Sequence, residues 1–284
     1  REILVDQFAM TLGSASAICS VGLARLGSAV SFVGKVGADL WGDYCTEFLA
    51  RFGVDTSLIV RDPALQTGLT ISISSEADRA LVTYLGAIRE LRESDISDAM
   101  LARFGHLHVS SFFLQEGLRP GLERLFTRAK ALGLTTSLDT GFDPAEEWGP
   151  GLAEVLSVTD VFLPNEVELA AISGSDAILE ALQSLDNGLT VTAAKLGANG
   201  AAALADGRLV ECPPMPVKPV DTTGAGDSFN AGFLHCWVRG EDIRTCLHAG
   251  VFAGGKSTEA MGGTGSQPDG EALDAYLKDV RTAR

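Results

Sequence analysis

The sequence predicts an α/β fold in which helices cover both faces of a mostly parallel sheet, with a small β-lid attached. Two observations support this class. Short apolar runs alternate with helical patterns along most of the 284 residues, and such alternation is typical of a parallel sheet buried on both faces. One region instead alternates apolar and polar residues, which predicts a hairpin exposed on one face.

In chain order, strands are expected at 29–37, 106–114, 134–140, 160–164 and 189–197. Between them, 40–53 and 121–133 are predicted to be helices, the first ended by Gly53. The hairpin comprises 67–75 and 79–86, and a hairpin that projects from a sheet is a natural lid, although an ordinary edge hairpin is the alternative. No repeat or linker divides the chain, so we expect one domain over 1–284 with a lid formed by about 6–13 and 66–88.

The charge of the chain argues against two classes of partner. The formal net charge is −15 without a basic run, which disfavours nucleic acid and anionic membranes. A bound polyanion would have to be held locally, by backbone amides, a metal ion or a few cations. Five cysteines without a C-x-x-C pair, and no apolar run of membrane-spanning length, indicate a soluble cytoplasmic protein with reduced thiols.

A P-loop pattern lies near the C-terminus. "GVFAGGKST" (250–258) fits G-x-x-x-x-G-K-[ST], with Lys256 and Ser257 in the diagnostic places. A P-loop needs a buried strand before it and a helix after it, but here a polar helical stretch precedes it and glycines soon follow. We therefore expect a helix whose small face permits close packing, formed by Gly250, Ala253, Gly254 and Ser257.

The segment "VDTTGAGDSFNAGFL" (220–234) carries the strongest functional signal. It passes through Gly224, Ala225 and Gly226 into a predicted helix. Amides at a helix start, with small side chains and a favourable dipole, form an anion hole for phosphate. Asp227 in the first turn would repel a phosphate, but it is well placed to accept a proton from a hydroxyl that attacks one. The alternative is an acidic residue that only complements the helix dipole.

This segment resembles the C-terminal signature of the PfkB/ribokinase family of sugar and nucleoside kinases, and further motifs match in family order over essentially the whole chain. The resemblance implies a ribokinase-like αβα sandwich with a β-lid. It also implies that Asp227 is the catalytic base and that the amides of Gly224, Ala225 and Gly226 stabilise the transferring phosphoryl group.

Substrate contacts are implied near the N-terminus. "EILVD" (2–6) resembles the first family strand, whose aspartate, here Asp6, binds hydroxyls. The glycine-rich signature (13–27) and "VGKVGADLWG" (33–42) add Gly13, Ser14, Gly34 and Asp39. The chain departs from the family where Ile18 replaces an asparagine that contacts sugar. The stretch between Asp6 and Gly13 is also short, for which we favour omission of a segment over a shortened lid.

After the lid, the family's Gly-Ala-Asn becomes Gly86-Ala87-Ile88, followed by Arg89. Arg89 is a candidate contact for an acidic or phosphorylated substrate, and an exposed loop arginine is the alternative.

Nucleotide and metal contacts are implied by motifs in the second half. "PNEVE" (164–168) resembles the N-x-x-E motif, and an asparagine and a glutamate three apart share a helix face and can hold magnesium-bound water; these are Asn165 and Glu168. Lys195 either reaches a phosphate or points to solvent. The remaining expected nucleotide contacts are Gly197, Gly200, Thr222, Thr223 and Gly263, and Asp221 is a candidate potassium contact.

We therefore expect a cytoplasmic ATP- and Mg²⁺-dependent kinase of a small sugar or sugar acid, forming a homodimer through its lid. The alternatives are a nucleoside kinase of the same fold, or a binding or regulatory protein that has kept the fold without activity. The four histidines lack metal-site spacing and receive no role.

Overall fold

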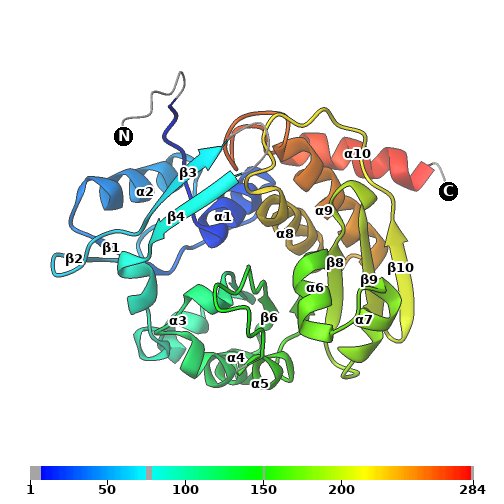
Figure 1. Ribbon diagram of the computed structural model, residues 1–284, viewed down its shortest axis with the longest axis horizontal. Coiled ribbons are helices and arrows are strands. Elements are labelled where there is room, and N and C mark those ends of the chain that lie inside the picture. Colours follow the sequence, from blue (N-terminus) through cyan, green and yellow to red (C-terminus); the bar gives the residue numbers. More distant parts are fainter. Residues whose placement is uncertain (1–7, 75–78, 150, 283–284) are drawn as a thin grey trace.

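A computed structural model describes residues 8–74, 79–149 and 151–282 (Figure 1). Its centre is a six-stranded sheet of order β10-β9-β8-β7-β6-β5. The strands are β5 (His106–Val109), β6 (Thr135–Leu138), β7 (Val161–Phe162), β8 (Val191–Lys195), β9 (Ala201–Ala205) and β10 (Arg208–Cys212). The first four are parallel, and β9 and β10 continue the sheet antiparallel. The predicted mostly parallel sheet is thus confirmed.

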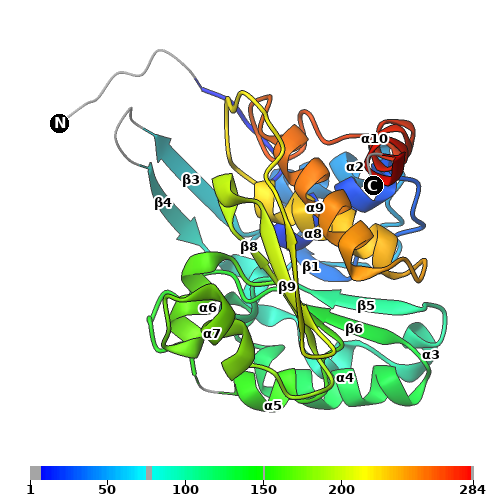
Figure 2. The same ribbon diagram turned by 90° about the vertical axis from the view of Figure 1, so that its right-hand side faces the viewer.

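Helices cover both faces of this sheet (Figure 2). One layer contains α1 (Ala15–Arg25), α8 (Ala225–Trp237), α9 (Ile243–Ser257) and α10 (Gly270–Thr282). The other contains α4 (Leu122–Ala131), α5 (Leu152–Leu156), α6 (Glu166–Ser173) and α7 (Ile178–Ser184), with the short α3 (Asp98–Leu101) beside them. Neighbouring residues of β8 face opposite layers, since Ala193 packs with α8 and α9 while Ala194 packs with α6 and α7. The αβα sandwich follows from this alternation.

The predicted hairpin stands apart from the central sheet. β3 (Leu69–Ser74) and β4 (Arg79–Tyr84) pair antiparallel and project from the body (Figure 1). At its base lie α2 (Leu40–Arg51) and a two-stranded parallel sheet of β1 (Gly34–Gly37) and β2 (Ile59–Asp62). Within the described part of the hairpin, Leu69, Ile71, Ile73, Val82 and Tyr84 are 38–59% exposed. Cross-strand pairing puts Leu69 opposite Tyr84 and Ile71 opposite Val82, which makes one face of the hairpin apolar.

All five predicted strands are shorter than expected, and the runs 106–114 and 29–37 lose the most residues, five of nine each. The run 106–114 leaves the sheet after Val109, because Ser111 adopts a left-handed conformation (φ 55°) and a 3-10 helix follows at Phe112–Leu114. Phe112 and Phe113 are buried there in the core against α4 and α5, so their apolar signal reflects tertiary packing and not a strand. In 29–37, only Gly34–Gly37 forms a strand.

The P-loop-like stretch lies in α9, as expected. An ideal Cβ on Gly250 would lie 2.7 Å from the ring of Phe229, and one on Gly254 would lie 2.9 Å from the carbonyl oxygen of Ala225. Both neighbours belong to α8, so these glycines allow the two helices to approach closely. The helix prediction is confirmed, and glycine serves packing here.

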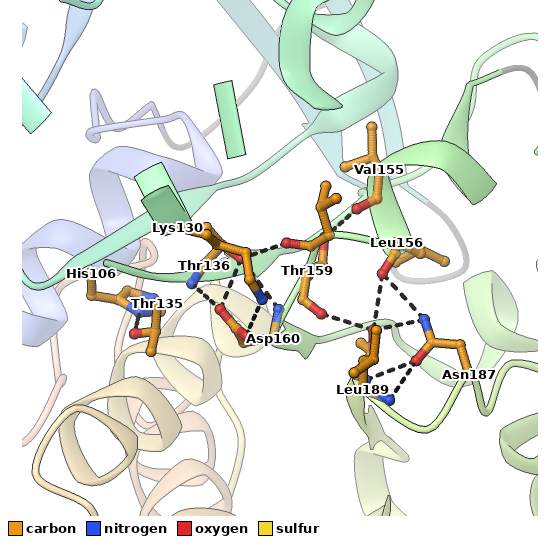
Figure 3. Close-up of polar contacts among 12 residues, drawn as sticks. His106, Lys130, Thr135, Thr136, Val155, Leu156, Thr159, Asp160, Asn187 and Leu189 are labelled. Atoms are coloured by element: carbon orange, nitrogen blue, oxygen red, sulfur yellow. Dashed lines mark hydrogen bonds and ion pairs between the residues drawn. The ribbon is translucent and has the colours of Figure 1, made fainter. Parts of the chain in front are cut away.

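The amino ends of the parallel strands are fixed by side-chain hydrogen bonds (Figure 3). The Asp160 carboxylate, just before β7, accepts from the amide of Thr136 at 2.8 Å and from Lys130 Nζ at 2.5 Å. Asn187 Nδ2 and the Thr190 hydroxyl donate to the carbonyl of Leu156 at 3.3 and 2.9 Å. These hydrogen bonds stabilise the sheet at its amino edge, and the carboxyl edge lies at the opposite end of the strands. Among the described helices, none has the length and apolarity that crossing a membrane requires.

Candidate active site

The carboxyl ends of β6, β7 and β8 bring three polar residues together. Asp139 follows β6 directly, Asn165 lies three residues after β7, and Lys195 is the last residue of β8. A parallel bridge joins Asn165 to Lys195, whose amide donates to the Pro164 carbonyl at 2.9 Å. Ligands of open α/β sheets bind outside this edge. The N-terminus of α8 meets the same place.

Gly224 is the N-cap of α8 and has a left-handed backbone (φ 70°). Only glycine fits there, since an added Cβ would lie 2.7 Å from Cα of Gly263 and 3.0 Å from Ile18 Cγ2. The Ala225 amide donates to the Thr222 carbonyl at 3.2 Å. The helix begins two residues earlier than Asp227, which therefore lies in its first turn as expected.

Lys195 does not point to solvent, so that alternative is wrong. Its side chain is only 10% exposed, and Nζ lies 2.6 Å from Asp139 Oδ2. Nζ also donates to Asn230 Oδ1 at 3.4 Å, and Asn230 Nδ2 donates to the same Asp139 oxygen. An ideal Cβ on Gly226 would lie 3.6 Å from Nζ. The ammonium thus lies directly beneath the first turn of α8.

Asn165 and Glu168 form a capping box at the start of α6. The Asn165 amide donates to Glu168 Oε2 at 2.9 Å, Asn165 Nδ2 donates to Oε1 at 2.7 Å, and the Glu168 amide donates to Asn165 Oδ1 at 2.9 Å. Each Glu168 oxygen keeps lone pairs beyond these bonds. Asn165 and Glu168 thus share one face of the helix start, as expected. The capping box holds the carboxylate of Glu168 in place, and this residue is 4% exposed.

Burial and mutual repulsion set the charges of these acids. Burial, followed by the charge of Asp139, raises the pKa of Asp227 to about 7. The same two causes raise the pKa of Glu168. Burial opposes ionisation of Asp139, yet Lys195 lowers the pKa of that carboxyl. Burial also opposes the charge of Lys195, but Asp139 and Glu168 outweigh it and raise the lysine pKa. Asp227 is therefore poised to exchange a proton near neutral pH.

The loop 261–266 closes the site beside Gly224. Asp221 Oδ1 accepts from the amide and hydroxyl of Thr223 at 2.9 and 2.7 Å, and Oδ2 accepts from the Gly262 amide at 2.9 Å. Gly263 packs on Ile18, where an added Cβ would lie 2.7 Å from Cδ1. Ile18 is 4% exposed and forms the floor under both glycines.

Two other predicted contact residues, Asp39 and Arg89, make side-chain contacts near the base of the lid. Asp39 caps α2 by accepting from the Gly42 amide at 2.8 Å, and it also accepts from the amide and hydroxyl of Thr67 at 2.8 and 2.7 Å. It thereby links α2 to the start of the lid. Arg89 lies in a 3-10 helix (Gly86–Glu90) after the lid, with Nε 3.9 Å from Glu116.

The structure also describes five more of the predicted contact residues. Ser14 caps α1 and, like Gly13, is exposed. An ideal Cβ on Gly34 would lie 2.8 Å from the Phe32 ring. Gly197 and Gly200 form the turn from β8 to β9 with left-handed backbones (φ 54° and 88°). Asp6 lies outside the described residues.

Two members of the site, Asp139 and Asn230, were missed by the sequence interpretation. Asp139 directly follows an apolar strand at the carboxyl edge, and Asn230 lies three residues after Asp227, on the same face of α8. The position of each residue could be read from the sequence. Its role could not, because only the register of the sheet shows that it lies beside Lys195.

The chemistry that this site supports is phosphoryl transfer. The N-terminus of a helix, a carboxylate whose pKa is raised to about 7, a buried ammonium and a buried glutamate converge at the edge of an α/β sandwich, an arrangement typical of a small-molecule phosphotransferase. The family model for pfkB family carbohydrate kinases matches residues 2–270, and the chain belongs to this family. It is accordingly an ATP-dependent kinase with a ribokinase-like fold.

Individual relatives agree with this assignment. An uncharacterised sugar kinase of Archaeoglobus fulgidus is 30% identical over 244 residues, which cover 85% of this chain and 96% of that protein. The structure of Arabidopsis thaliana ribokinase with ribose and ATP superposes with a TM-score of 0.86 at 25% identity, covering 98% and 91% of the two chains. Fructokinase of Vibrio cholerae with fructose, ADP and calcium gives 0.83 at 27% identity, covering 96% and 93%.

Proposed function

We propose that this protein transfers the γ-phosphoryl group of ATP to a hydroxyl of a small sugar or sugar acid, with Asp227 as the general base. The observation that carries the proposal is the position of Asp227 in the first turn of α8, beside the anion hole, with a pKa raised to about 7 by burial and by Asp139. A base that titrates near the working pH is the most effective acceptor for a hydroxyl proton.

The amides of Gly224, Ala225 and Gly226 would receive the negative charge that develops on the phosphoryl oxygens, because the positive end of the α8 dipole meets them there. The Ala225 amide, which donates to the Thr222 carbonyl at 3.2 Å, would have to share or exchange that bond. Thr222, Thr223, Gly197, Gly200 and the 261–266 loop with Gly263 would line the nucleotide side. Gly13, Ser14, Gly34 and Arg89 would line the substrate side, and Asp39 would hold the lid base through Thr67. Asp6 stays a prediction.

The residues present fit a hydrated magnesium ion. Glu168 would be a buried oxygen ligand, held in place by Asn165, and the described residues contain no cluster of three or more metal-ligating side chains. Mg²⁺ is commonly held through one or two carboxylates, waters and substrate phosphates. When bound, it would neutralise phosphate charge. Asp221, which ties Thr223 to Gly262, is the proposed contact for a monovalent cation.

We also propose a homodimer formed through the lid, because the apolar face of β3 and β4 is exposed in the single chain. Contiguous apolar surface of this kind marks interaction sites.

The proposed function is tested by a coupled ADP-release assay over a panel of sugars, sugar acids and nucleosides. Wild-type protein should release ADP with one sugar or sugar acid, and Asp227→Asn should lose about 10²–10⁴-fold in kcat while still binding nucleotide. A nucleoside as the sole acceptor would favour the nucleoside kinase. No turnover with any acceptor, despite ATP binding, would favour a regulatory protein.

A further inference from the structure

The arrangement around Lys195 goes beyond the base and the anion hole. A lysine ammonium is normally unfavourable next to a helix N-terminus, where the dipole is already positive. Here Nζ lies beneath Gly226, so two positive groups converge on one point of the site. This convergence needs a compensating anion, and the chain supplies one in Asp139 at 2.6 Å.

Asn230 makes the arrangement directional. Its Nδ2 donates to the Asp139 oxygen that accepts from Lys195, and its Oδ1 accepts from the lysine. The reversed amide would set an NH₂ group against the ammonium and an oxygen against the carboxylate. The three side chains therefore form a closed ring that holds Nζ in one place. Asn230 is fully buried and lies one helical turn beyond Asp227.

The charges do not balance within the site. Asp139, Glu168 and Asp227 contribute up to three negative charges against the one positive charge of Lys195. The groups that face Asp227 are Asp139 at the end of β6, Lys195 at the end of β8 and Glu168 on α6. The Cys19 thiol on α1 is also near, and burial and the charge of Asp227 keep it protonated by raising its pKa. Lys195 is thus the cation among the acids that face the base.

We propose that Lys195 faces the transferring phosphoryl group from beneath the first turn of α8, and that Asp139 and Asn230 are positioning residues that hold its ammonium there. This inference rests on the proposed function. It assigns roles to two residues outside the sequence motifs, and it makes the buried ion pair part of the site and not merely of the core.

The variants Lys195→Met and Asp139→Asn test the inference, because they should shift the pKa of Asp227 in opposite directions. Loss of the cation should shift the rising limb of kcat/KM against pH upward, and loss of the neighbouring carboxylate should shift it downward. Lys195→Met should also lose about 10²–10³-fold in kcat, with the KM of the sugar little changed. These two shifts test whether both charges lie beside Asp227, and the loss of kcat at unchanged KM tests whether Lys195 acts on the phosphoryl group. A pair with only a structural role would leave the kcat of a folded Lys195→Met variant close to that of the wild type.

Lys130→Met is the matched control, since Lys130 pairs with Asp160 at 2.5 Å at the amino edge of the sheet, away from the site (Figure 3). Its pH profile should equal that of the wild type. If the single variants fold poorly, the double variant Lys195→Met/Asp139→Leu replaces the buried pair by apolar groups, which is often tolerated. A folded double variant with wild-type kcat would overturn the inference.

A second measurement separates this inference from the proposed function. The carboxyl ¹³C resonance of Asp227, assigned by its loss in Asp227→Asn, can be titrated in the free protein without ATP or acceptor. Lys195→Met should raise its midpoint and Asp139→Asn should lower it. If the wild type phosphorylates nothing but these shifts occur, the proposed function fails, while the placement of Lys195 and Asp139 beside Asp227 stands. If the wild type is active and the midpoints do not move, the inference is wrong.

Discussion

Gly224 and Gly263 are in backbone contact, since a Cβ added to Gly224 would lie 2.7 Å from Cα of Gly263. The proposed anion hole and the loop expected to line the nucleotide pocket therefore form one packed unit. Gly224 cannot gain a methyl group without moving Gly263, and a methyl group on Gly263 would meet Ile18 Cδ1 at 2.7 Å. The contact explains why a glycine is needed at the N-cap of α8 beyond its left-handed φ.

Gly224→Ala should abolish turnover, because the backbone of one loop must move. Gly207→Ala is the matched control, since Gly207 has the same φ of 70° with nothing within 4 Å of its added Cβ. Both variants should lose about 1–2 kcal/mol of stability to left-handed strain. Only Gly224→Ala should also lose ATP affinity, measured by calorimetry. Equal ATP binding by the two variants would contradict the contact's role.

The pKa of Asp227 predicts how activity depends on pH. As the proposed base it acts in its carboxylate form, so kcat/KM should rise with pH and level off above about pH 8, with a midpoint at about 7. The profile is measured at saturating Mg²⁺ over pH 5.5–9. A flat profile across this range would exclude Asp227 as the titrating base.

Stability should respond with the opposite sign. Because folding raises the pKa of this acid, its stabilising contribution is complete below its unfolded pKa near 4 and is lost as pH rises through about 7. Asp227→Asn removes the titration, so the variant should gain Tm relative to the wild type between pH 4 and 8. A constant Tm difference across that range would contradict the raised pKa.

Glu168→Gln should weaken the binding of magnesium, because a neutral amide is a poorer ligand for magnesium-bound water. We expect the Mg²⁺ concentration for half-maximal rate to rise about 10–100-fold, as for groups that orient metal ligands. Glu166→Gln is the control, an exposed glutamate in the same helical turn. If both variants keep the wild-type Mg²⁺ dependence, Glu168 has no part in holding the ion.

Local motifs were predictable from the sequence because their geometry is local. Asn165 and Glu168 are three residues apart, and Asp227 follows the Gly-Ala-Gly directly, so helix periodicity alone places each of them. The partners of Lys195 are 56 and 35 residues away, and Asp139 and Asn230 are 91 apart. Such pairs depend on sheet order and register, which no short pattern specifies.

The lid predicts how the chain associates. Ile71 and Val82 are directly paired and 56% and 58% exposed on the apolar face. Ile71→Lys should convert a dimer to a monomer, measured by light scattering, since a charge in an apolar interface lacks a partner. Thr83→Lys, on the opposite face where its hydroxyl lies 3.0 Å from that of Thr70, should remain dimeric. A monomeric wild type would rule out the lid dimer.

Lys256 tests whether the P-loop pattern has any nucleotide role. Its ammonium lies 2.6 Å from Glu259, and both side chains are about one-third exposed, so the pair contributes no more than about 1 kcal/mol. Lys256→Ala should keep ATP affinity and lower Tm by at most a few degrees.

The control for that stretch is Gly250→Ala, whose added Cβ would meet the Phe229 ring at 2.7 Å. Overpacking there should cost about 1–3 kcal/mol, which lowers Tm and leaves the chemistry of Asp227 in place once folded. The two variants together separate packing from binding. If Lys256→Ala loses ATP affinity at unchanged Tm, the phosphates lie at α9, and the anion hole at the start of α8 must be reassigned.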